Sequence, residues 1–277
     1  MIAVVVPVFN APAETARCLA ALAATVDEQV PVVVIDDASD DVEVAEVLAG
    51  MPSHWVRVHN EKNLGFVATA NLGMALAGEA DIVLLNADTQ VTAGWLEAIR
   101  RCANSDTSIA SITPLTNNGE IASIPEFCRP NPWPEDAECW ARACRESGEP
   151  MCPEVPTGVG FCMYLRRACL DCIGEFDEQA FGRGYGEEND WCMRAMQAGW
   201  RHVLCDEAFV AHQGGASFGP LGLAPGGQAM ETLLQRYPDY MDRVSAFIEA
   251  DPMATRRQQI INHYNQLAAN ATRQPRT

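Results

Sequence analysis

The opening run of the chain constrains its fold more than any other feature. Residues 2–8 read IAVVVPV and end at Phe9 and Asn10, with Pro12 just beyond. An apolar, β-branched run without polar alternation is typical of a strand that is buried on both faces of a parallel sheet. Because parallel strands need a long crossover, the chain must continue through a helix and return as another strand.

The first 115 residues repeat this alternation. Helix-forming residues at 13–25 lead to a second apolar run at 30–35, which ends at Asp36 and Asp37. The pattern predicts an α/β fold with a mixed, mainly parallel sheet flanked by helices. Further strands are predicted at 55–59, 81–85 and 108–113, and further helices near 41–49, 65–77 and 93–103.

The alternation stops between residues 117 and 156, where prolines, acidic residues and two tryptophans cluster. We interpret this stretch as a loop insertion with one short helix, a lid or a cleft wall rather than a domain. We place one domain at 1–218 and a C-terminal helical extension at 219–277, beyond a Gly/Pro-rich linker at 214–227. The body is predicted to finish with a strand at 159–165, a short helix from Arg166, a helix at 187–198 and strands at 201–205 and 208–211.

The charge of the chain excludes one class of partner. The sequence has 37 acidic and 19 basic residues and a net charge of −18. Residues 252–277 contain four arginines (256, 257, 273 and 276) and no carboxylate, so residues 1–251 carry −18 − 4 = −22. Such a body repels nucleic-acid phosphates, and we expect no nucleic-acid partner. A small anionic ligand would need a bound cation to offset the negative electrostatic field of the protein.

The eleven cysteines have no regular metal-ligand spacing beyond Cys169 and Cys172. Their odd number, with no leader before the first strand, favours reduced, buried thiols in a cytoplasmic protein. A structural zinc within 128–172, which holds seven of them, stays open as an alternative. No apolar run approaches the roughly 20 residues of a membrane span.

Polar residues end three of the predicted strands. Asn10 follows the first strand, Asp36 and Asp37 end the second, and Asn86 with Asp88 follows the fourth. Each alone is an ordinary turn residue. Together they predict a crevice beyond the carboxyl ends of the parallel strands, where such sheets bind ligands. No GxGxxG or GxxxxGK(S/T) loop is present, so phosphates must be held in another way.

Asn86, Ala87 and Asp88 place two oxygen-bearing side chains at one strand end. This suits a hard divalent cation that shares the oxygens of a diphosphate and offsets the charge of a leaving diphosphate. His212, at the end of the last predicted strand, would add a nitrogen ligand and favour manganese. Taken alone, His212 is more typical of a hydrogen-bonded loop histidine than of a metal ligand.

Glu187, Glu188 and Asp190 cluster at the start of a predicted helix, after a Gly-rich turn. Helix capping and the helix dipole explain one or two of them. Transfer of a glycosyl group to a hydroxyl needs a carboxylate that takes the proton. Glu188 and Asp190 lie two residues apart, so we expect at most one to face the cleft, kept ionised by the helix dipole. Trp191 is expected in the core.

These motifs, in this order, resemble the family 2 glycosyltransferases of the GT-A fold over residues 2–218. The opening strand and turn match VVVPVFN at 4–10, and the next motif matches Asp36, Asp37 and Ser39. The metal motif matches 86–88, with Asn86 where the family has Asp. The other matches are Asn63, Gly65, Phe66, Ala70 and Asn71; Gly186, Glu187, Glu188, Asp190, Cys192 and Arg194; and His212, Gly215 and Ser217.

The resemblance implies an inverting transferase that moves a sugar from UDP or dTDP to a saccharide or lipid-linked acceptor, with Mn²⁺ or Mg²⁺. It is most similar to a bacterial polysaccharide branch that includes rhamnosyltransferases. Asp88 and His212 would bind the metal, and Glu188, with Asp190 beside it, would be catalytic. Trp133 and Trp140 are candidates for stacking on sugar rings. The donor would contact Pro7, Phe9, Asn10, Asp37, Asn63, Gly65, Asn71, Asn86 and Ala87.

Two other functions compete with this one. A nucleotidyltransferase would need a Gly-rich, basic loop after the first strand, and residues 8–14 contain no Gly, Lys or Arg. A degenerate carbohydrate-binding module is opposed by the presence of Asp88, Glu188 and His212 together. The arginines of the C-terminal tail fit contact with an anionic membrane, a homodimer interface or a plain solvated helix.

Overall fold

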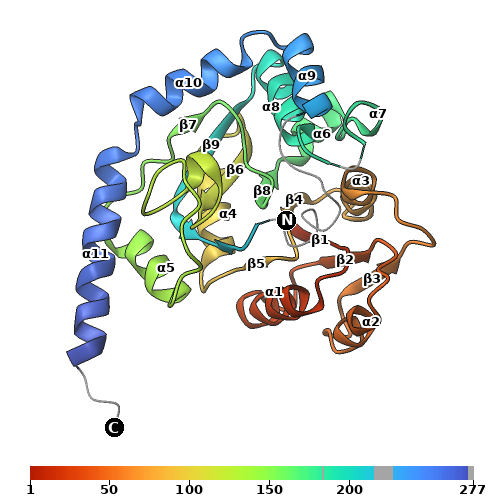
Figure 1. The fold of residues 1–277 in the computed structure, drawn as a ribbon, viewed down its shortest axis with the longest axis horizontal. Coiled ribbons are helices and arrows are strands. Elements are labelled where there is room, and N and C mark those ends of the chain that lie inside the picture. Colours follow the sequence, from red (N-terminus) through yellow and green to blue (C-terminus); the bar gives the residue numbers. More distant parts are fainter. Residues whose placement is uncertain (183, 215–226, 274–277) are drawn as a thin grey trace.

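The computed structural model describes residues 1–182, 184–214 and 227–273. Within these residues, the centre is an eight-stranded sheet in the order β3-β2-β1-β4-β8-β6-β9-β7 (Figure 1). The strands are β1 (Ile2–Val8), β2 (Val32–Asp36), β3 (Val56–His59), β4 (Asp81–Leu85), β6 (Ile109–Leu115), β7 (Glu154–Val155), β8 (Cys162–Leu165) and β9 (Arg201–Phe209).

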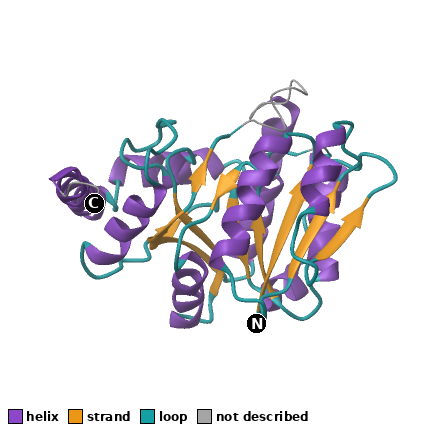
Figure 2. Cartoon of the chain, turned by 90° about the horizontal axis from the view of Figure 1, so that it is seen from below, coloured by secondary structure: helices purple, strands orange, loops and turns teal. Residues whose placement is uncertain are grey.

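Helices flank the strands (Figure 2). A small antiparallel ladder joins β5 (Thr89–Gln90) to β10 (Ala211–His212). The helices are α1 (Pro12–Thr25), α2 (Val42–Ala49), α3 (Phe66–Leu76), α4 (Trp95–Ser105), η1 (Glu120–Ala122, a 3₁₀ turn), α5 (Ala137–Glu146), α6 (Arg167–Ile173), α7 (Glu178–Phe181), α8 (Glu187–Gln197), α9 (Gly227–Arg236), α10 (Tyr240–Ala250) and α11 (Ala254–Arg273).

The first half of the sheet is parallel, and its strands β1, β2 and β4 are buried on both faces, as the apolar runs predict, whereas the edge strand β3 is largely exposed. Val4 and Val6 of β1 pack into the cluster that contains α1, α2 and α4, whereas Val5 packs with α3, α6 and α8 on the other face. Helix α3 approaches β1 closely at Gly73, where a Cβ would lie 2.2 Å from Val5 Cγ1. A larger residue at Gly73 would push α3, and the site residues that precede it, away from the sheet.

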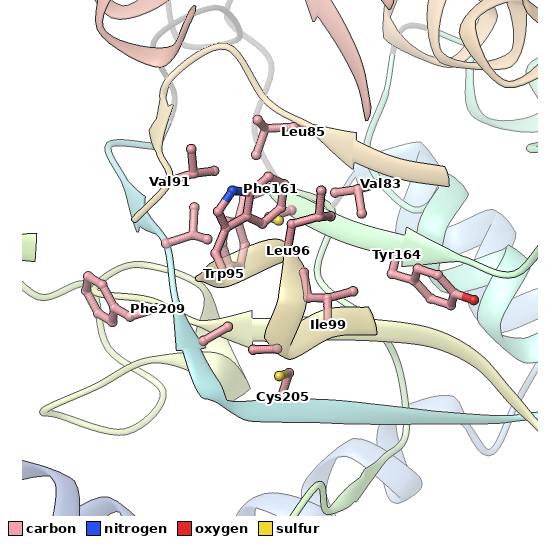
Figure 3. Packing of buried hydrophobic residues seen from close by; sticks show 14 of the residues in the cluster. Val83, Leu85, Val91, Trp95, Leu96, Ile99, Phe161, Tyr164, Cys205 and Phe209 are labelled. Atoms are coloured by element: carbon pink, nitrogen blue, oxygen red, sulfur yellow. The ribbon is translucent and has the colours of Figure 1, made fainter. Parts of the chain in front are cut away.

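Antiparallel pairs enter in the second half of the sheet. Strand β8 runs antiparallel to both β4 and β6, while β6 and β9 are parallel. The mixed, mainly parallel sheet predicted from the sequence is therefore confirmed. Figure 3 shows the core on this side, where Trp95, Leu96 and Ile99 of α4 lie among buried residues that include Val83 of β4 and Phe161, just before β8.

The two strands predicted at 201–205 and 208–211 are one long strand, β9, followed by β10. Asp206 and Glu207 lie between the two predicted strands. Asp206 is fully buried, where it accepts hydrogen bonds from the backbone N–H groups of Met151 and Cys152 and pairs with Arg256 at 2.7 Å. The strand continues because the buried carboxylate has these partners.

The insertion at 117–156 has one helix, α5, as expected, but it also contributes β7 to the sheet edge. The assignment of Trp140 to sugar stacking is wrong: the side chain is 7% exposed and stacks on Tyr264 of α11 with ring centroids 3.9 Å apart. Trp133 is 36% exposed, and the Arg17 guanidinium lies 4.2 Å from its ring centroid.

The described part of the C-terminal extension is helical, as predicted, whereas most of the linker predicted at 214–227 lies outside the described residues. Arg256 is buried in its pair with Asp206, and Arg257 pairs with Asp251. These two arginines are therefore not free to form a basic surface. No described helix has the length and hydropathy that a membrane span requires.

The cysteines are free thiols, and several lie deep in the core, as expected. The described residues contain no cluster of three or more His, Cys, Asp or Glu side chains that could hold a metal ion, so the zinc alternative gains no support. Among the described residues, the buried cysteines are Cys18, Cys102, Cys144, Cys162, Cys169, Cys192 and Cys205.

Candidate active site

A cavity of about 670 Å³ lies at the carboxyl ends of β1, β2 and β4. This is the sheet edge at which the polar strand ends were expected to meet. It brings together residues that are far apart in the sequence. The residues singled out from the sequence that line it are Pro7, Phe9, Asp37, Asn63, Gly65, Phe66, Asn86, Ala87, Asp88, Gly186, Glu187, Glu188 and His212.

Two of the expected donor-binding residues lie outside the cavity lining. The Asn10 side chain accepts hydrogen bonds from the backbone N–H groups of Asp40 and Asp41, which fixes the loop after β2. Asn71 lies in α3, where its amide donates to the Phe176 carbonyl oxygen and its Oδ1 accepts from the Phe176 N–H. Both residues hold chain segments together in this structure.

Asp190 points away from the cavity, into the contact between α8 and α9. Its carboxylate is fully buried and accepts hydrogen bonds from Arg194 Nε and Arg236 Nη1, each at 2.8 Å, and from the Tyr237 hydroxyl at 3.0 Å. Glu188, two residues earlier, lines the cavity. We expected at most one of the two carboxylates to face the cleft, and of the two only Glu188 lines the cavity. Asp190 instead holds α8 against the end of α9.

Asp37 holds the loop that leads into α3. Its Oδ1 accepts hydrogen bonds from Asn60 Nδ2 and the Leu64 N–H at 2.8 Å, and its Oδ2 accepts from the Gly65 N–H at 2.9 Å. Gly65 adopts a φ of +87°, which favours glycine at this turn. Asp37 thus shapes the part of the cavity formed by 63–66.

The ladder between β5 and β10 brings Asp88 and His212 together. His212 is paired with Thr89, the residue after Asp88, and the imidazole Nε2 lies 3.5 Å from the Asp88 carboxylate. The ring also stacks on Phe161, with centroids 5.0 Å apart. Both side chains are largely buried, so their relative position is set by the ladder and by packing.

The orientation of His212 leaves one ring nitrogen available. Nδ1 lies 2.5 Å from the Asn118 carbonyl oxygen, which can only accept, so Nδ1 carries the proton in the neutral ring. Asn117 fixes the same strand by donating to the His212 carbonyl oxygen and accepting from its N–H. Nε2 therefore presents its lone pair toward Asp88, as a metal-binding histidine does.

These groups fit a divalent cation that is shared with a bound ligand. Asp88 supplies a carboxylate, His212 supplies Nε2, and the buried Oδ1 of Asn86 has no hydrogen-bond partner within the described part of the chain. Oxygen and imidazole nitrogen suit Mn²⁺, and oxygen alone suits Mg²⁺. Because these protein groups are few, coordination positions of the cation would remain for water or for oxygens of a phosphorylated ligand.

Glu187, which is buried, and Glu188, which is half-buried, form a carboxyl pair at the N-terminus of α8. Gly186 begins the helix with a φ of +94°, and an Oε2 atom of each glutamate is buried without a hydrogen-bond partner in the described residues. Burial, together with the neighbouring charge of Glu188, raises the pKa of Glu187 well above its usual value. Burial also raises the pKa of Glu188.

The expectation that the helix dipole sets the charge of Glu188 is therefore incomplete, because burial opposes ionisation. The neighbouring Glu187 carboxyl group acts in the opposite sense and favours the ionised form of Glu188, so burial and this neighbour together set the pKa of Glu188. A carboxylate whose pKa lies above that of an exposed glutamate is a stronger proton acceptor when it is ionised.

Several cavity residues escaped the sequence analysis. Glu120 and Asn118 come from the start of the 117–156 insertion, and Tyr185 comes from the Gly-rich turn. A doubled asparagine directly after β6 was a usable signal, because it lies at the same sheet edge. The side chains from α9 and α10 gave no such signal. The predicted matches Gly215 and Ser217 lie outside the described residues.

Solved structures share this fold. One is GalNAc-T7, crystallised with UDP, GalNAc and Mn²⁺, with a TM-score of 0.63 and 14% identity over 95% of this chain and 54% of that chain. Another is the 1–349 fragment of Staphylococcus aureus TarS, with a TM-score of 0.54 and 15% identity over 95% of this chain and 78% of that one. The chain thus spans about half of the GalNAc-T7 chain. No curated protein sequence matches it.

The family comparison is more specific than the shared fold. The model of the family described as glycosyl transferase family 2 matches residues 3–174, which is more than half of the chain. The matched segment contains the strands that carry Asp37, Asn86 and Asp88 to the cavity. The protein belongs to glycosyl transferase family 2.

Proposed function

We propose that the chain is an inverting glycosyltransferase that moves a sugar from a UDP- or dTDP-sugar to a hydroxyl group, with Mn²⁺ or Mg²⁺ held by Asp88 and His212. The observation that carries this proposal is the presence of Asp88, His212 Nε2 and Glu188 in one cavity at the carboxyl ends of the strands. The UDP, GalNAc and Mn²⁺ of the GalNAc-T7 structure are consistent with this ligand class.

The charge of the cavity supports a cation in the donor site. Asp37, Asp88 and the Glu187–Glu188 pair line it, and no lysine or arginine appears among its described lining residues. A nucleoside diphosphate brings further negative charge to this field. A bound divalent cation would neutralise part of the diphosphate charge and stabilise the departing group.

The residues of the chain supply the remaining steps. Pro7, Phe9 and the loop held by Asp37 would contact the nucleoside, while Asn86 and Ala87 lie beside the expected diphosphate position. Glu188 would accept the proton of the acceptor hydroxyl as its oxygen attacks the anomeric carbon. Because the bond to the nucleoside diphosphate breaks on the opposite face of that carbon in the same single displacement, the configuration inverts.

Other parts of the proposal rest on the resemblance. They are a saccharide or lipid-linked acceptor, a role in a bacterial cell-surface polysaccharide pathway and membership of the rhamnosyltransferase-like branch. The proposed cytoplasmic location rests instead on the cysteine content. We also propose the division into a GT-A domain at 1–218 and a C-terminal extension at 219–277.

Donor turnover tests the proposal. The chain should release nucleoside diphosphate from at least one of UDP-glucose, UDP-galactose, UDP-N-acetylglucosamine, UDP-N-acetylgalactosamine and dTDP-rhamnose when Mn²⁺ is present. Glu188→Gln should slow release by about 10²- to 10⁴-fold, the range for loss of a general base, with unchanged affinity for UDP. Glu28→Gln, a matched change at an exposed site, should leave release unchanged.

Two outcomes would contradict the proposed enzymatic function or the role of Glu188 in it. Nucleotide binding without release from any donor would favour the degenerate binding module. Full activity in Glu188→Gln would exclude Glu188 as the base and require another proton acceptor in the cavity.

A further inference from the structure

One wall of the cavity comes from the C-terminal helices. Ala229, Met230 and Leu233 of α9 and Tyr240, Met241 and Val244 of α10 line it, in the same cavity as Glu188. The start of α9 lies against the N-terminus of α8, because a Cβ on Gly186 would be 3.7 Å from Ala229 Cβ. In Figure 1 these helices lie beside one another at the edge of the molecule.

This wall packs on the core on one side and faces the cavity on the other. Leu233 and Tyr240 are buried in the core cluster beneath, and Arg236 pairs with the buried Asp190 of α8. Met230 and Val244 are only partly buried against that cluster, and Met241 is 44% exposed. The wall therefore has a fixed position but keeps free apolar surface on the cavity side. Methionine side chains adapt to ligands of irregular shape.

The rest of the cavity disfavours a charged acceptor. Its described lining contains Asp37, Asp88, Glu120 and the Glu187–Glu188 pair, and it contains no lysine or arginine. A cation held at Asp88 would be matched by the donor diphosphate, so it would leave no positive charge for a second anion.

We propose that the acceptor is an uncharged molecule with an alkyl or aryl group next to the hydroxyl that receives the sugar, and that Met230, Met241 and Val244 contact this group. This inference rests on the proposed glycosyltransferase function and adds the acceptor class to it. Apolar surface with a few polar groups at one end is the usual composition of a small-molecule site. Here the polar end is Glu188.

Binding of three acceptor mimics to the complete chain with UDP and Mn²⁺ tests the inference by calorimetry. The mimics are methyl β-glucoside, octyl β-glucoside below its micellar concentration, and the octyl phosphodiester of glucose. The octyl glucoside should bind at least about tenfold more tightly than the methyl glucoside, the effect of covering roughly two methylene groups. The phosphodiester should bind more weakly than the octyl glucoside.

Matched variants locate the binding surface. The double variant Met230→Gln/Met241→Gln keeps side-chain size and should reduce the octyl-to-methyl affinity ratio by about fivefold or more. Met151→Gln changes a 52% exposed methionine outside the cavity and should leave the ratio unchanged. Circular dichroism and the UDP affinity of each variant separate loss of folding from loss of acceptor contact.

The results distinguish the two proposals. Absence of binding of both UDP and dTDP by the wild-type chain would overturn the proposed function itself. Normal UDP binding with equal affinities for the octyl and methyl glucosides, or an unchanged ratio in the double variant, would overturn the apolar acceptor site alone. Tightest binding of the phosphodiester would overturn the requirement for an uncharged acceptor.

Discussion

Replacement of Arg256 by Met should destabilise the whole domain. Arg256 of α11 is 1% exposed, and its guanidinium donates hydrogen bonds to the Asp206 carboxylate at 2.7 Å, to Ser147 Oγ at 2.8 Å and to the Cys144 carbonyl oxygen at 2.7 Å. Met fills much of the same volume but removes all three bonds. It leaves the fully buried Asp206 charge with only two backbone N–H partners.

The expected cost is about 3–5 kcal/mol, the range for a buried ion pair that loses one partner. Guanidinium denaturation, followed by circular dichroism and tryptophan fluorescence, measures it. Trp140 stacks on Tyr264 of α11 and so reports on the same contact. Because α11 is bound to β9 through this pair, we expect one transition for the sheet and the C-terminal helices together.

Two further variants check the reasoning. Arg243→Met removes an ion pair whose two side chains are each about half exposed, and it should cost about 0–1 kcal/mol. Asp206→Asn added to Arg256→Met should recover part of the loss, because the buried charge disappears. A cost below about 1 kcal/mol for Arg256→Met, or a separate early transition of α11 in the wild-type chain, would refute this account.

Three other predictions follow from buried groups. Burial lowers the pKa of His202 from 6.5 to about 4, so on acidification the unfolded chain binds the proton first. The free energy of unfolding should therefore fall between pH 6.5 and 4 by up to about 3 kcal/mol. His202→Gln should flatten this pH dependence in urea titrations, and an unchanged pH dependence would contradict the assignment. Asp190→Asn breaks the ion pairs with Arg194 and Arg236 and should cost about 2–3 kcal/mol with an unchanged donor KM; a stable but inactive variant would instead give Asp190 a catalytic role. Because burial raises the pKa of Glu188, the acid limb of kcat/KM should have its midpoint above 4.5; a midpoint at or below 4.5 in a pH profile would contradict this effect of burial.

The strands of the parallel half were predictable because their sequences carry a strong physical signal. Val4, Val5 and Val6 must be buried on alternate faces, and this requires helices on both sides. The polar residues that end these strands were equally informative, since Asp37 and Asn86 line the cavity. The element boundaries follow from such local features.

Features that depend on distant contacts were not predictable. Asp206 looks like a strand breaker until Arg256, fifty residues later, is known to neutralise it. The two-residue strands β5 and β10 form only because they pair with each other. Met230 and Val244 read as ordinary helix residues, and only the packing of α9 and α10 on the core makes them part of the cavity.

The metal dependence of nucleotide binding tests the central claim most directly. Titration of UDP into the wild-type chain should give a Kd at least about tenfold lower with Mn²⁺ than with EDTA, a difference of about 1.4 kcal/mol. Asp88→Asn should abolish this difference, whereas Asp171→Asn, a matched change at an exposed side chain outside the cavity, should retain it. Equal UDP affinity with Mn²⁺ and with EDTA, or an unaltered metal effect in Asp88→Asn, would contradict a donor site built on Asp88 and His212.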